Sequence, residues 1–532
     1  MDTPKYRPAK VVGFTLRDTS TVLLDDELYP QAISFLSSLL HSGGSQNRQW
    51  STEAYTPCAR QLVLLSTIVV HPLFTNRASN AERSEASNST LHLLYDITKV
   101  VGPVNAGFAA AFDFSSHRAL RTHTRKRAAP LDSDSDDSDE LRDRNLESKY
   151  ARSESVWMQA DDLWHIVGWS FNCSIKYKKR WERWALWLEF IVSAIEADWK
   201  ERVHHAKETV EFGPSAARGL LRGSMIFQYV GGNEGRNRQR RIMRAILADG
   251  QQKSLNEFPE IWNNETKERK SKKDQLDKPS KKINLDEGEF GDYDIDDDED
   301  ELMEDGDEDG EGDVTITPDS EDSESKKIRA EAPDPFQLGT AKLGGVTAVS
   351  LRLRLLALLL KLSCDLPRDF TNNAEEFLDL YTEFLRPLPL PHFCALSTNP
   401  YIDAANHVCL LVNHLIPLTA VSPPKDLFNI TQQDLVRDFI PRAANAYSNV
   451  DNAKVSVVLE CLFVSMLDHF GIEPTEEFGS AVEEGIRARK ARAIGDARKK
   501  DKGTSGDEKN ARKELDFSSE RLMTLLEMIE EG

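Results

Sequence analysis

Arginine is the residue whose placement in this chain most suggests binding chemistry. The stretch ARGLLRGSMIFQYVGGNEGRNRQRRIMRAIL holds seven arginines, no lysine and a single acid, Glu234. The planar guanidinium fork suits phosphate or carboxylate, and the glycines would present backbone N–H groups at the start of the last helix. The sequence therefore predicts a surface that binds an anionic partner; an arginine face paired with acids of the same chain is the alternative. The predicted surface consists of Arg218, Arg222, Arg236, Arg238, Arg240, Arg241 and Arg244.

A second group of cations begins the stretch KYKKRWERWALWLEFIVSAIEADW, residues 176–199. The macrodipole of a helix favours negative charge at its N-terminus, so local helix stability does not explain these cations. They either face an acidic partner or are ordinary solvated side chains, and the sequence favours neither. Whether they share one surface with Arg236–Arg244 is also open. The candidate residues are Lys176, Lys178, Lys179, Arg180 and Arg183.

The tryptophans that follow these cations are better explained by a buried helix than by base stacking. Apolar side chains recur there at steps of three and four residues, which is the broad apolar face of a core helix. A base-stacking surface would instead need rings exposed along an open groove. Seven of the nine tryptophans fall within 157–199, which predicts one rigid helical hairpin. The predicted buried face consists of Trp181, Trp184, Leu188, Ile191, Ile195 and Trp199.

The sequence contains no familiar catalytic or cofactor-binding motif. It has no G-x-x-x-x-G-K-[ST], no G-x-G-x-x-G after a strand, no H-E-x-x-H and no G-x-S-x-G. The six cysteines are scattered, without a C-x-x-C pair or a partnering histidine. We therefore expect no enzymatic activity, catalytic residue, bound metal, cofactor or small-molecule substrate. The longest apolar runs are too short to cross a bilayer, so no membrane partner is expected.

The negative charge of the chain comes from one tract. Residues 284–325 contain 22 aspartates and glutamates and no lysine or arginine. Because the whole chain has a net charge of −21, the remainder carries about +1. A block of like charges repels itself and favours an extended, solvated chain. The net negative charge of the chain is therefore a property of this tract and not of the folded surface.

The apolar periodicity predicts a mostly α-helical protein, with an irregular multi-helix or α-solenoid-like body interrupted by long disordered charged segments. In NNAEEFLDLYTEFL, Asn373 is placed to cap a helix with Phe377, Leu380, Tyr381 and Leu385 on one face. A short hairpin at 10–25 is the one candidate for β structure. No defensible repeat of 30–50 residues is found.

Composition divides the chain into seven parts. Segments rich in charge and poor in apolar side chains bury too little surface to offset the entropy of ordering, so we expect them to be disordered. These are a basic and acidic linker at 114–155, a basic and then acidic tract at 253–340, and a charged linker at 494–515. The expected ordered parts are an N-terminal helical region at 1–113, a tryptophan-rich region with the arginine-rich helix at 156–252, a C-terminal helical region at 341–493, and a short amphipathic helix at 516–532.

The short C-terminal helix is expected to dock. FSSERLMTLLEMIEEG places its apolar side chains on one face after a charged linker. A helix of this length is marginal in isolation, so it should pack on this protein or on a partner. The candidate docking residues are Leu522, Leu525, Leu526 and Ile529.

Short charged patterns favour the nucleus. RKR at 125–127 and KERKSKK at 267–273 resemble nuclear-import clusters. Ser133 precedes Asp136 by three positions in an acidic run, which makes it a candidate phosphosite where phosphate would add negative charge. We expect a nuclear location, with the nucleolus as a narrower alternative.

These features predict a non-enzymatic nuclear protein-interaction scaffold or complex subunit with acidic tails that phosphorylation can tune. The expected partners are other proteins, above all basic or multi-subunit nuclear ones, with nucleic acid as a further candidate. One alternative is a nucleic-acid-associated factor in chromatin or ribosome assembly that binds phosphates through the 218–244 arginines. Another is an acidic chaperone for histones or other basic clients.

Overall fold

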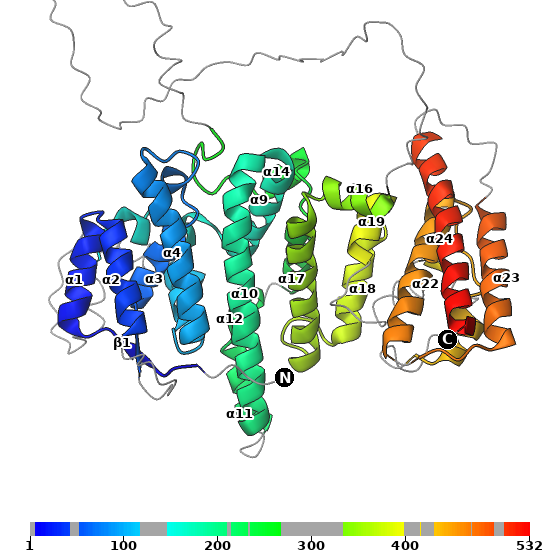
Figure 1. Ribbon diagram of the computed structural model, residues 1–532, viewed down its shortest axis with the longest axis horizontal. Helices are drawn as coiled ribbons and strands as arrows, with labels where there is room; N and C mark the ends of the chain where they lie inside the picture. The colour runs from blue at the N-terminus through cyan, green and yellow to red at the C-terminus, as the bar shows by residue number, and fades with distance from the viewer. Residues whose placement is uncertain are drawn as a thin grey trace, which may run out of the picture. The chain divides into compact units, whose positions relative to one another are not determined.

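Helix α10 (Lys178–Glu208) is the longest element of the computed structural model, with 31 residues. It forms where apolar side chains recur every three or four residues. All six side chains of its predicted buried face are at most 8% exposed. The prediction of a core helix, in place of a stacking surface, is confirmed. Helix α10 stands between α4 (Ala81–Val100) and α17 (Val346–Asp365) and contacts both (Figure 1).

The structure describes residues 6–42, 53–117, 146–209, 214–231, 235–267, 334–397, 415–416, 430–469, 471–493 and 505–531. Of these residues, 73% are helical and 2% are in strands. The expected mostly α-helical, irregular multi-helix body is therefore confirmed. The acidic tract at 284–325, the RKR cluster at 125–127 and the candidate phosphosite Ser133 lie outside the described residues.

The N-terminal region is helical except for two short strands that pair in parallel, with Ala9 opposite Ala54. The predicted hairpin at 10–25 is wrong, because most of that stretch forms a helix. Parallel strands need a long crossover between them, and two helices occupy that connection. The elements are β1 (Ala9–Val11), α1 (Phe14–Asp25), α2 (Tyr29–His41), β2 (Ala54–Thr56), α3 (Ala59–Ile68), η1 (Pro72–Phe74), α4 and α5 (Phe108–Ala111).

The tryptophan-rich region begins with two helices. Asp162 separates them, and its carboxylate accepts the His165 backbone N–H at 2.8 Å as the N-cap of the second. Trp157 of the first helix stacks on Phe112 with ring centroids 4.7 Å apart, and its indole N–H donates to Ser66 Oγ at 2.8 Å. The region thus shares its core with the N-terminal one. Its elements are η3 (Lys149–Ala151), α8 (Val156–Gln159), α9 (Leu163–Lys176), α10, α11 (Pro214–Arg222), α12 (Met225–Val230), α13 (Gly235–Ile246) and α14 (Gln252–Glu257).

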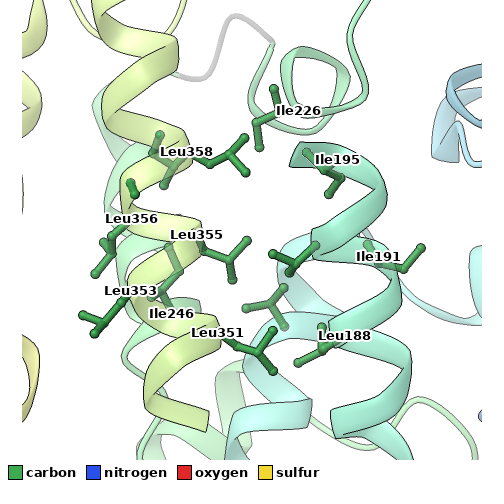
Figure 2. Packing of buried hydrophobic residues seen from close by; sticks show 14 of the residues in the cluster. Leu188, Ile191, Ile195, Ile226, Ile246, Leu351, Leu353, Leu355, Leu356 and Leu358 are labelled. Carbon is green, nitrogen blue, oxygen red and sulfur yellow. The ribbon is translucent and has the colours of Figure 1, made fainter. Parts of the chain in front are cut away.

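Leucine and isoleucine side chains fill the space between α10 and α17 (Figure 2). The six side chains named below are each 3% exposed or less, and burial of each side chain contributes roughly 1.5–3 kcal/mol relative to an exposed position. The steps of three and four residues on both helices let the two rows of side chains interdigitate. The rows include Leu188, Ile191 and Ile195 of α10 and Leu351, Leu355 and Leu358 of α17.

The C-terminal region follows the predicted helical patterns. The Asn373 side chain accepts the Glu376 backbone N–H at 2.8 Å, so the predicted cap of α18 is confirmed. The predicted apolar face of that helix is at most 5% exposed. The elements are α16 (Pro335–Lys342), α17, α18 (Ala374–Leu385), α19 (Leu390–Ser397), α21 (Gln432–Asp434), the π-helical turn η6 (Leu435–Phe439), α22 (Asn449–His469), α23 (Glu476–Arg492) and α24 (Ser505–Glu531).

Helix α24 is longer than predicted, so the charged linker predicted at 494–515 is wrong from residue 505 onward. Ala511 and Leu515 are buried, and they anchor the front of the helix among its charged residues. The helix contacts α22 and α23. Its candidate docking residues face the core of this chain: Leu522 and Leu526 are buried, and Leu525 and Ile529 pack at the core's edge.

Two other segments expected to be disordered are partly ordered. Within 114–155, Tyr150 is 1% exposed and lies 4.9 Å from the Phe74 ring, measured between ring centroids. Within 253–340, Phe258 and Trp262 are buried and α16 begins at Pro335. A few aromatic side chains at the ends of these two charged segments pack on the folded body. The average composition of a long segment does not reveal such residues, so both ends were predicted to be disordered.

The described residues belong to one compact unit made of 1–268 and 334–532. One hydrophobic cluster extends through it from Leu24 of α1 to Leu526 of α24. The three expected helical regions therefore contribute to a shared core. Among the described helices, none is by itself both long and apolar enough to cross a membrane. The pair α16 and α17, bent by 87°, meets that test by length and composition only.

Candidate functional site

Helix α13, which carries most of the predicted anion-binding arginines, packs a narrow apolar stripe into the core. Ile242, Met243 and Ile246 are fully buried, and the helix contacts α9, α17 and α18. Because the stripe is narrow, the arginines flank it. Their long apolar stems let the guanidinium groups reach acids on the neighbouring helices.

Four arginines of α13 form ion pairs with carboxylates of this chain: three are close, and the fourth is a 4.0 Å contact between Arg236 and Glu383. The arginines of the three close pairs are between 27% and 39% exposed, so these pairs lie at the edges of the helix contacts. Charge-assisted bonds of this kind tie α13 to three neighbouring elements. The pairs are Arg240–Glu383 with α18, Arg241–Asp162 with the cap of α9, and Arg244–Glu257 with α14.

The remaining predicted arginines differ in their surroundings. Arg222 donates to both carboxylate oxygens of Asp369, at 2.7 and 3.2 Å, and Arg238 donates to a backbone carbonyl at 3.1 Å. Arg236 is 73% exposed and makes only a long contact, 4.0 Å, with Glu383, and Arg218 is also exposed. Most of the predicted surface is therefore neutralised within the chain, and Arg218 and Arg236 are its most solvent-facing members. Binding of an anionic partner by these residues stays a prediction.

Removal of a paired arginine from α13 is expected to lower stability. Arg241→Ala deletes the guanidinium 2.5 Å from Asp162 and should reduce the free energy of unfolding by about 1 kcal/mol, because the pair is half-buried. Arg236→Ala is the matched control on the same helix. It should cost less than about 0.5 kcal/mol, since this side chain is 73% exposed. Urea unfolding would measure both, and equal losses would contradict a structural role for Arg241.

The cations that open α10 lie at the other end of α9 from Arg241. Arg241 binds Asp162 at the N-terminal end of α9, whereas Lys178 donates to the Ser174 carbonyl at the C-terminal end of α9. Because α9 has 14 residues, these ends are about 20 Å apart. Arg241 and Lys178 therefore lie at opposite ends of α9. The exposed cations at this end are Lys176, Lys178 and Lys179.

Arg180 is a core residue, so its place among the predicted partner-binding cations is wrong. Its side chain is 2% exposed, and Nη2 lies 3.2 Å from Oε2 of Glu265, which is 0% exposed. Its Nη1 donates to Thr75 Oγ1 at 3.1 Å. Arg183, one turn further along, is half-buried and donates to Asn88 Oδ1 at 2.6 Å. Of the five predicted cations, only the three lysines remain exposed.

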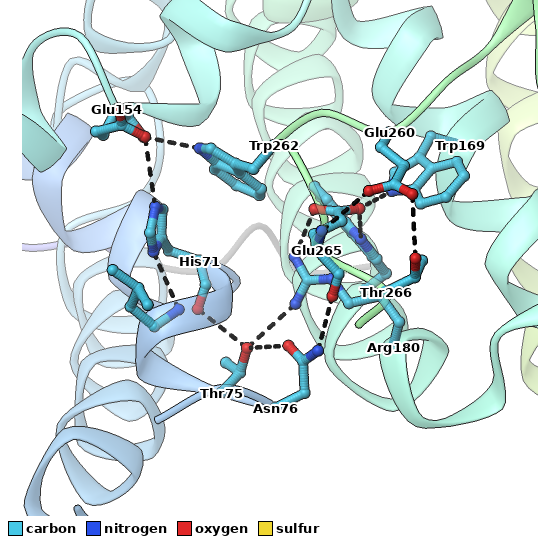
Figure 3. Close-up of polar contacts among 12 residues, drawn as sticks. His71, Thr75, Asn76, Glu154, Trp169, Arg180, Glu260, Trp262, Glu265 and Thr266 are labelled. Carbon is cyan, nitrogen blue, oxygen red and sulfur yellow. Dashed lines mark hydrogen bonds and ion pairs between the residues drawn. The ribbon is translucent and has the colours of Figure 1, made fainter. Parts of the chain in front are cut away.

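Glu265 collects hydrogen-bond donors from several elements (Figure 3). Its carboxylate accepts the indole N–H groups of Trp169 and Trp184 as well as Arg180. Its backbone carbonyl accepts Asn76 Nδ2 at 2.7 Å. Burial raises the pKa of the Glu265 carboxyl, while Arg180 and the indoles oppose that rise. These bonds clamp the last described stretch before residue 268 onto α9, α10 and the turn after η1.

His71 lies beside this network, next to Glu154 and Trp262 (Figure 3). Its ring centroid is 4.9 Å from those of Tyr150 and Trp262. Its Nδ1 accepts the Leu73 backbone N–H at 3.2 Å, which places the proton of neutral His71 on Nε2, 3.8 Å from Glu154 Oε2. Burial lowers the pKa of His71, and Glu154 opposes that change. A second proton on Nδ1 would also break the bond from Leu73.

The pH dependence of stability is expected to report on His71. An unfolded histidine titrates near pH 6.5, so below that pH the unfolded chain binds a proton that folded His71 resists. The free energy of unfolding should fall as the pH drops below about 6.5, through the lowered folded-state pKa. Guanidinium unfolding at about pH 7.5 and about pH 5.5, in the native chain and His71→Gln, would measure this.

Other histidines are expected to contribute to the same loss of stability at low pH. Burial lowers the pKa of His117 and of His392 in the same direction. His71→Gln should therefore reduce the loss of stability between the two pH values without abolishing it. An unchanged loss in His71→Gln would contradict the prediction.

Arg7 binds the carbonyls of Leu40 and Ser42 at the end of α2, and three further buried cations bind backbone carbonyls at the C-terminal ends of neighbouring helical elements. The last carbonyls of a helix lack intrahelical partners and carry partial negative charge, so a cation is stabilised there. Sequence reasoning missed all three, because a backbone carbonyl leaves no mark on the side-chain sequence. They are Arg352 on Ile246 and Ala248, Lys454 on Arg386 and Leu388, and Arg489 on Ile440 and Arg442.

The described surface also contains an open cavity of about 460 Å³ between residues 441–447 and the end of α23, which we call the α23 pocket. It is lined by Arg442, Tyr447 and Arg492, with a proline and three alanines. The sequence did not indicate this pocket. The helix macrodipole favours basic residues at a helix C-terminus, so arginines there do not by themselves suggest a site. The signal was RARKAR at 487–492, which the fold places beside PRAANAY.

Among the described residues, no group of three or more His, Cys, Asp or Glu side chains is arranged to hold a metal ion. Comparison of the chain with protein-family models, curated proteins and solved structures finds no match. Functional inference therefore rests on the residues themselves: the paired arginines of α13, the lysines beside α9, the acidic tract and the α23 pocket.

Proposed function

We propose that this chain is a non-enzymatic protein-interaction scaffold of the nucleus whose acidic tract recruits basic partners. The helical body would hold the main partner. The tract at 284–325 would add electrostatic contacts, and phosphorylation in the acidic segments would strengthen them. The observation that carries the proposal is the internal pairing of the arginines of α13.

The acids that neutralise α13 belong to the folded body. Asp162, Glu257 and Glu383 supply the carboxylates of its four ion pairs, two of which share Glu383. Helix α13 therefore does not need the tract as its counter-charge, and the chain outside the tract carries only about +1 against the 22 acids within it. Such a segment attracts cationic partners and speeds their association, over a range that salt limits to about 8 Å.

Both flanks of the segment that contains the tract are anchored to the body. On one side Glu265 is fully buried in its ion pair. On the other side Asp334 Oδ1 accepts the Phe336 backbone N–H at 3.1 Å and caps α16. A tether at both ends keeps the tract at high effective concentration near any partner that the body holds.

The nuclear location and the two alternative functions differ in how much support they have. The basic clusters at 125–127 and 267–273 favour nuclear import. Nucleic-acid binding through the 218–244 arginines has less support, because most of them already have partners in the chain. A chaperone for basic clients is a narrower form of the same proposal, in which the tract alone suffices.

Affinity purification of the tagged full chain from nuclear extract, with and without nuclease, tests this proposal. The matched variant keeps the length of the tract but replaces its 22 acids with asparagine and glutamine. We expect the main partner to survive nuclease treatment. Partners rich in lysine and arginine should be lost from the neutralised variant and should dissociate as salt is raised.

Three results would overturn parts of this proposal. Loss of every partner on nuclease treatment would favour the nucleic-acid alternative. Equal capture of basic partners by the native and neutralised chains would remove the role of the tract. A cytoplasmic location of the tagged chain would overturn the nuclear assignment.

A further inference from the structure

The α23 pocket presents two guanidinium groups that no described carboxylate neutralises. Arg492 Nη1 donates to the Ala444 carbonyl at 2.9 Å, and the guanidinium carbon lies 4.9 Å from the centroid of the Tyr447 ring. Arg442 Nη2 donates to the Arg437 carbonyl at 3.3 Å, and its buried Nε has no partner in the described part of the chain. Both side chains therefore keep N–H groups and a full positive charge for a ligand.

A third guanidinium, that of Arg489, joins the two walls of the pocket. Arg489 is 0% exposed, and its Nη1 donates to the carbonyls of Ile440 and Arg442 at 2.9 and 3.1 Å. Its Nε and Nη2 are buried without a described partner, and burial lowers its pKa to about 10. These bonds hold the wall in place, and the buried charge adds a positive potential that low-dielectric surroundings screen weakly.

The cations just outside the pocket are paired. Arg487 Nη2 lies 3.2 Å from Glu483 Oε2, and Lys490 Nζ lies 3.1 Å from Asp516 Oδ1. Among the described residues of α23, the cations next to the pocket therefore have acidic partners, whereas the two arginines in the pocket do not. A nucleic acid would need several phosphate contacts along a basic stripe, so this surface is poorly suited to one.

The size and lining of the pocket indicate a ligand larger than a bare ion. A volume of about 460 Å³ falls within the range of pockets that enclose whole ligand groups. Guanidinium forks suit carboxylates, and the exposed Tyr447 ring and the alanine walls suit an adjacent apolar side chain. Carboxylates next to apolar residues are what an acidic peptide supplies.

We infer that the α23 pocket binds an acidic peptide segment, with carboxylates on Arg442 and Arg492 and an apolar neighbour against Tyr447. The inference rests on the pocket and does not depend on the proposed scaffold function. Two sources could supply this chemistry. One is an acidic segment of a partner protein, and the other is the tract of this chain, in which Tyr293 and Ile295 stand among acids.

Fluorescence anisotropy with a labelled synthetic peptide of residues 287–305, EGEFGDYDIDDDEDELMED, tests the inference on the full chain. Arg442→Ala and Arg492→Ala should each weaken binding about 10-fold or more, the loss expected for one charge-assisted contact. Ala488→Leu should weaken it as well, because the added side chain fills the pocket and keeps both charges. The native chain should lose affinity as salt is raised.

Arg487→Ala is the matched control, since it removes the same charge from the same helix outside the pocket. It should change the affinity less than about 2-fold. Circular dichroism of each variant identifies any that fails to fold, and the Ala488→Leu result then decides, because it removes no guanidinium contact to the wall. Absence of peptide binding to every chain used, equal weakening by Arg487→Ala, or tighter binding of a single-stranded oligonucleotide of equal charge would overturn the inference.

Repeating the titration on the full chain with its tract acids replaced by amides separates the two sources. Tighter binding of the added peptide to that chain means that the tract competes for the pocket. Unchanged binding means that the pocket is open to a partner's acidic segment. Both results support an acidic-peptide site, provided that the arginine variants weaken binding in the neutralised chain too.

Discussion

Glu265→Gln is expected to lower the free energy of unfolding by about 3–5 kcal/mol, because it leaves Arg180 as an uncompensated charge in the core. Arg180 is 2% exposed, and Glu265 is its one carboxylate partner among the described residues. The indole of Trp184 lies under the guanidinium at 5.0 Å and cannot replace a counter-ion. Guanidinium unfolding followed by the fluorescence of the nearby tryptophans would measure the loss.

A double variant distinguishes the lost ion pair from a general packing defect. Arg180→Met with Glu265→Leu removes both charges and keeps apolar volume, so it should recover roughly half of the loss. Recovery should be incomplete, because Trp169 and Thr75 lose their partners. A double variant less stable than Glu265→Gln, or a single-variant loss below about 1 kcal/mol, would contradict this account of the core.

Arg352→Met should be the second most damaging substitution, with a loss of about 3 kcal/mol. Its guanidinium donates to the carbonyls of Ile246 and Ala248, at 3.4 and 2.9 Å, and lies 4.0 Å from the centre of the Phe171 ring. Burial lowers the pKa of Arg352 to about 9. Methionine relieves the buried charge but leaves two carbonyls at the end of α13 without donors, at about 1–3 kcal/mol each.

Arg354→Met, two positions along the same helix, is the control. Arg354 binds Glu189 at 2.5 Å and Glu196 at 2.7 Å across α10. Those carboxylates are 41% and 37% exposed, so water can solvate them when the guanidinium is removed. The expected loss is about 1 kcal/mol. An Arg354→Met loss as large as that of Arg352→Met would show that burial does not set the difference.

Sequence patterns predicted the features that depend on near neighbours in the chain. The buried face of α10, the Asn373 cap of α18 and the mostly helical fold all follow from periodicities or contacts within one or two helical turns. The hairpin at 10–25 fails for a related reason. Its threonines and valines favour strands, but α1 buries only Ser20 and Leu24, so its apolar spacing is too sparse to mark a helix.

Charged residues were harder to interpret, because their partners are distant in the chain. Arg240 and Glu383 are 143 residues apart, and Arg180 and Glu265 are 85 apart. No local rule connects such residues, so a solvated cation, an internal ion pair and a ligand-binding cation have the same sequence signature. The arginines of the α23 pocket show the same difficulty from the other side. Basic residues are ordinary at the end of a helix, so nothing in the sequence singled them out. Only the structure shows that, among the described residues, no carboxylate pairs with them.

By itself, the sequence determined that this protein is a helical body interrupted by charged segments, with one tract carrying all of the net negative charge. These properties follow from composition and short-range periodicity, which tertiary packing does not change. The tertiary structure decided which cations are neutralised inside the body and which face solvent. It placed Arg180 in the core, tied α13 to three neighbours and left Arg442 and Arg492 beside a cavity, because electrostatic pairing depends on distances in space and not on order in the chain.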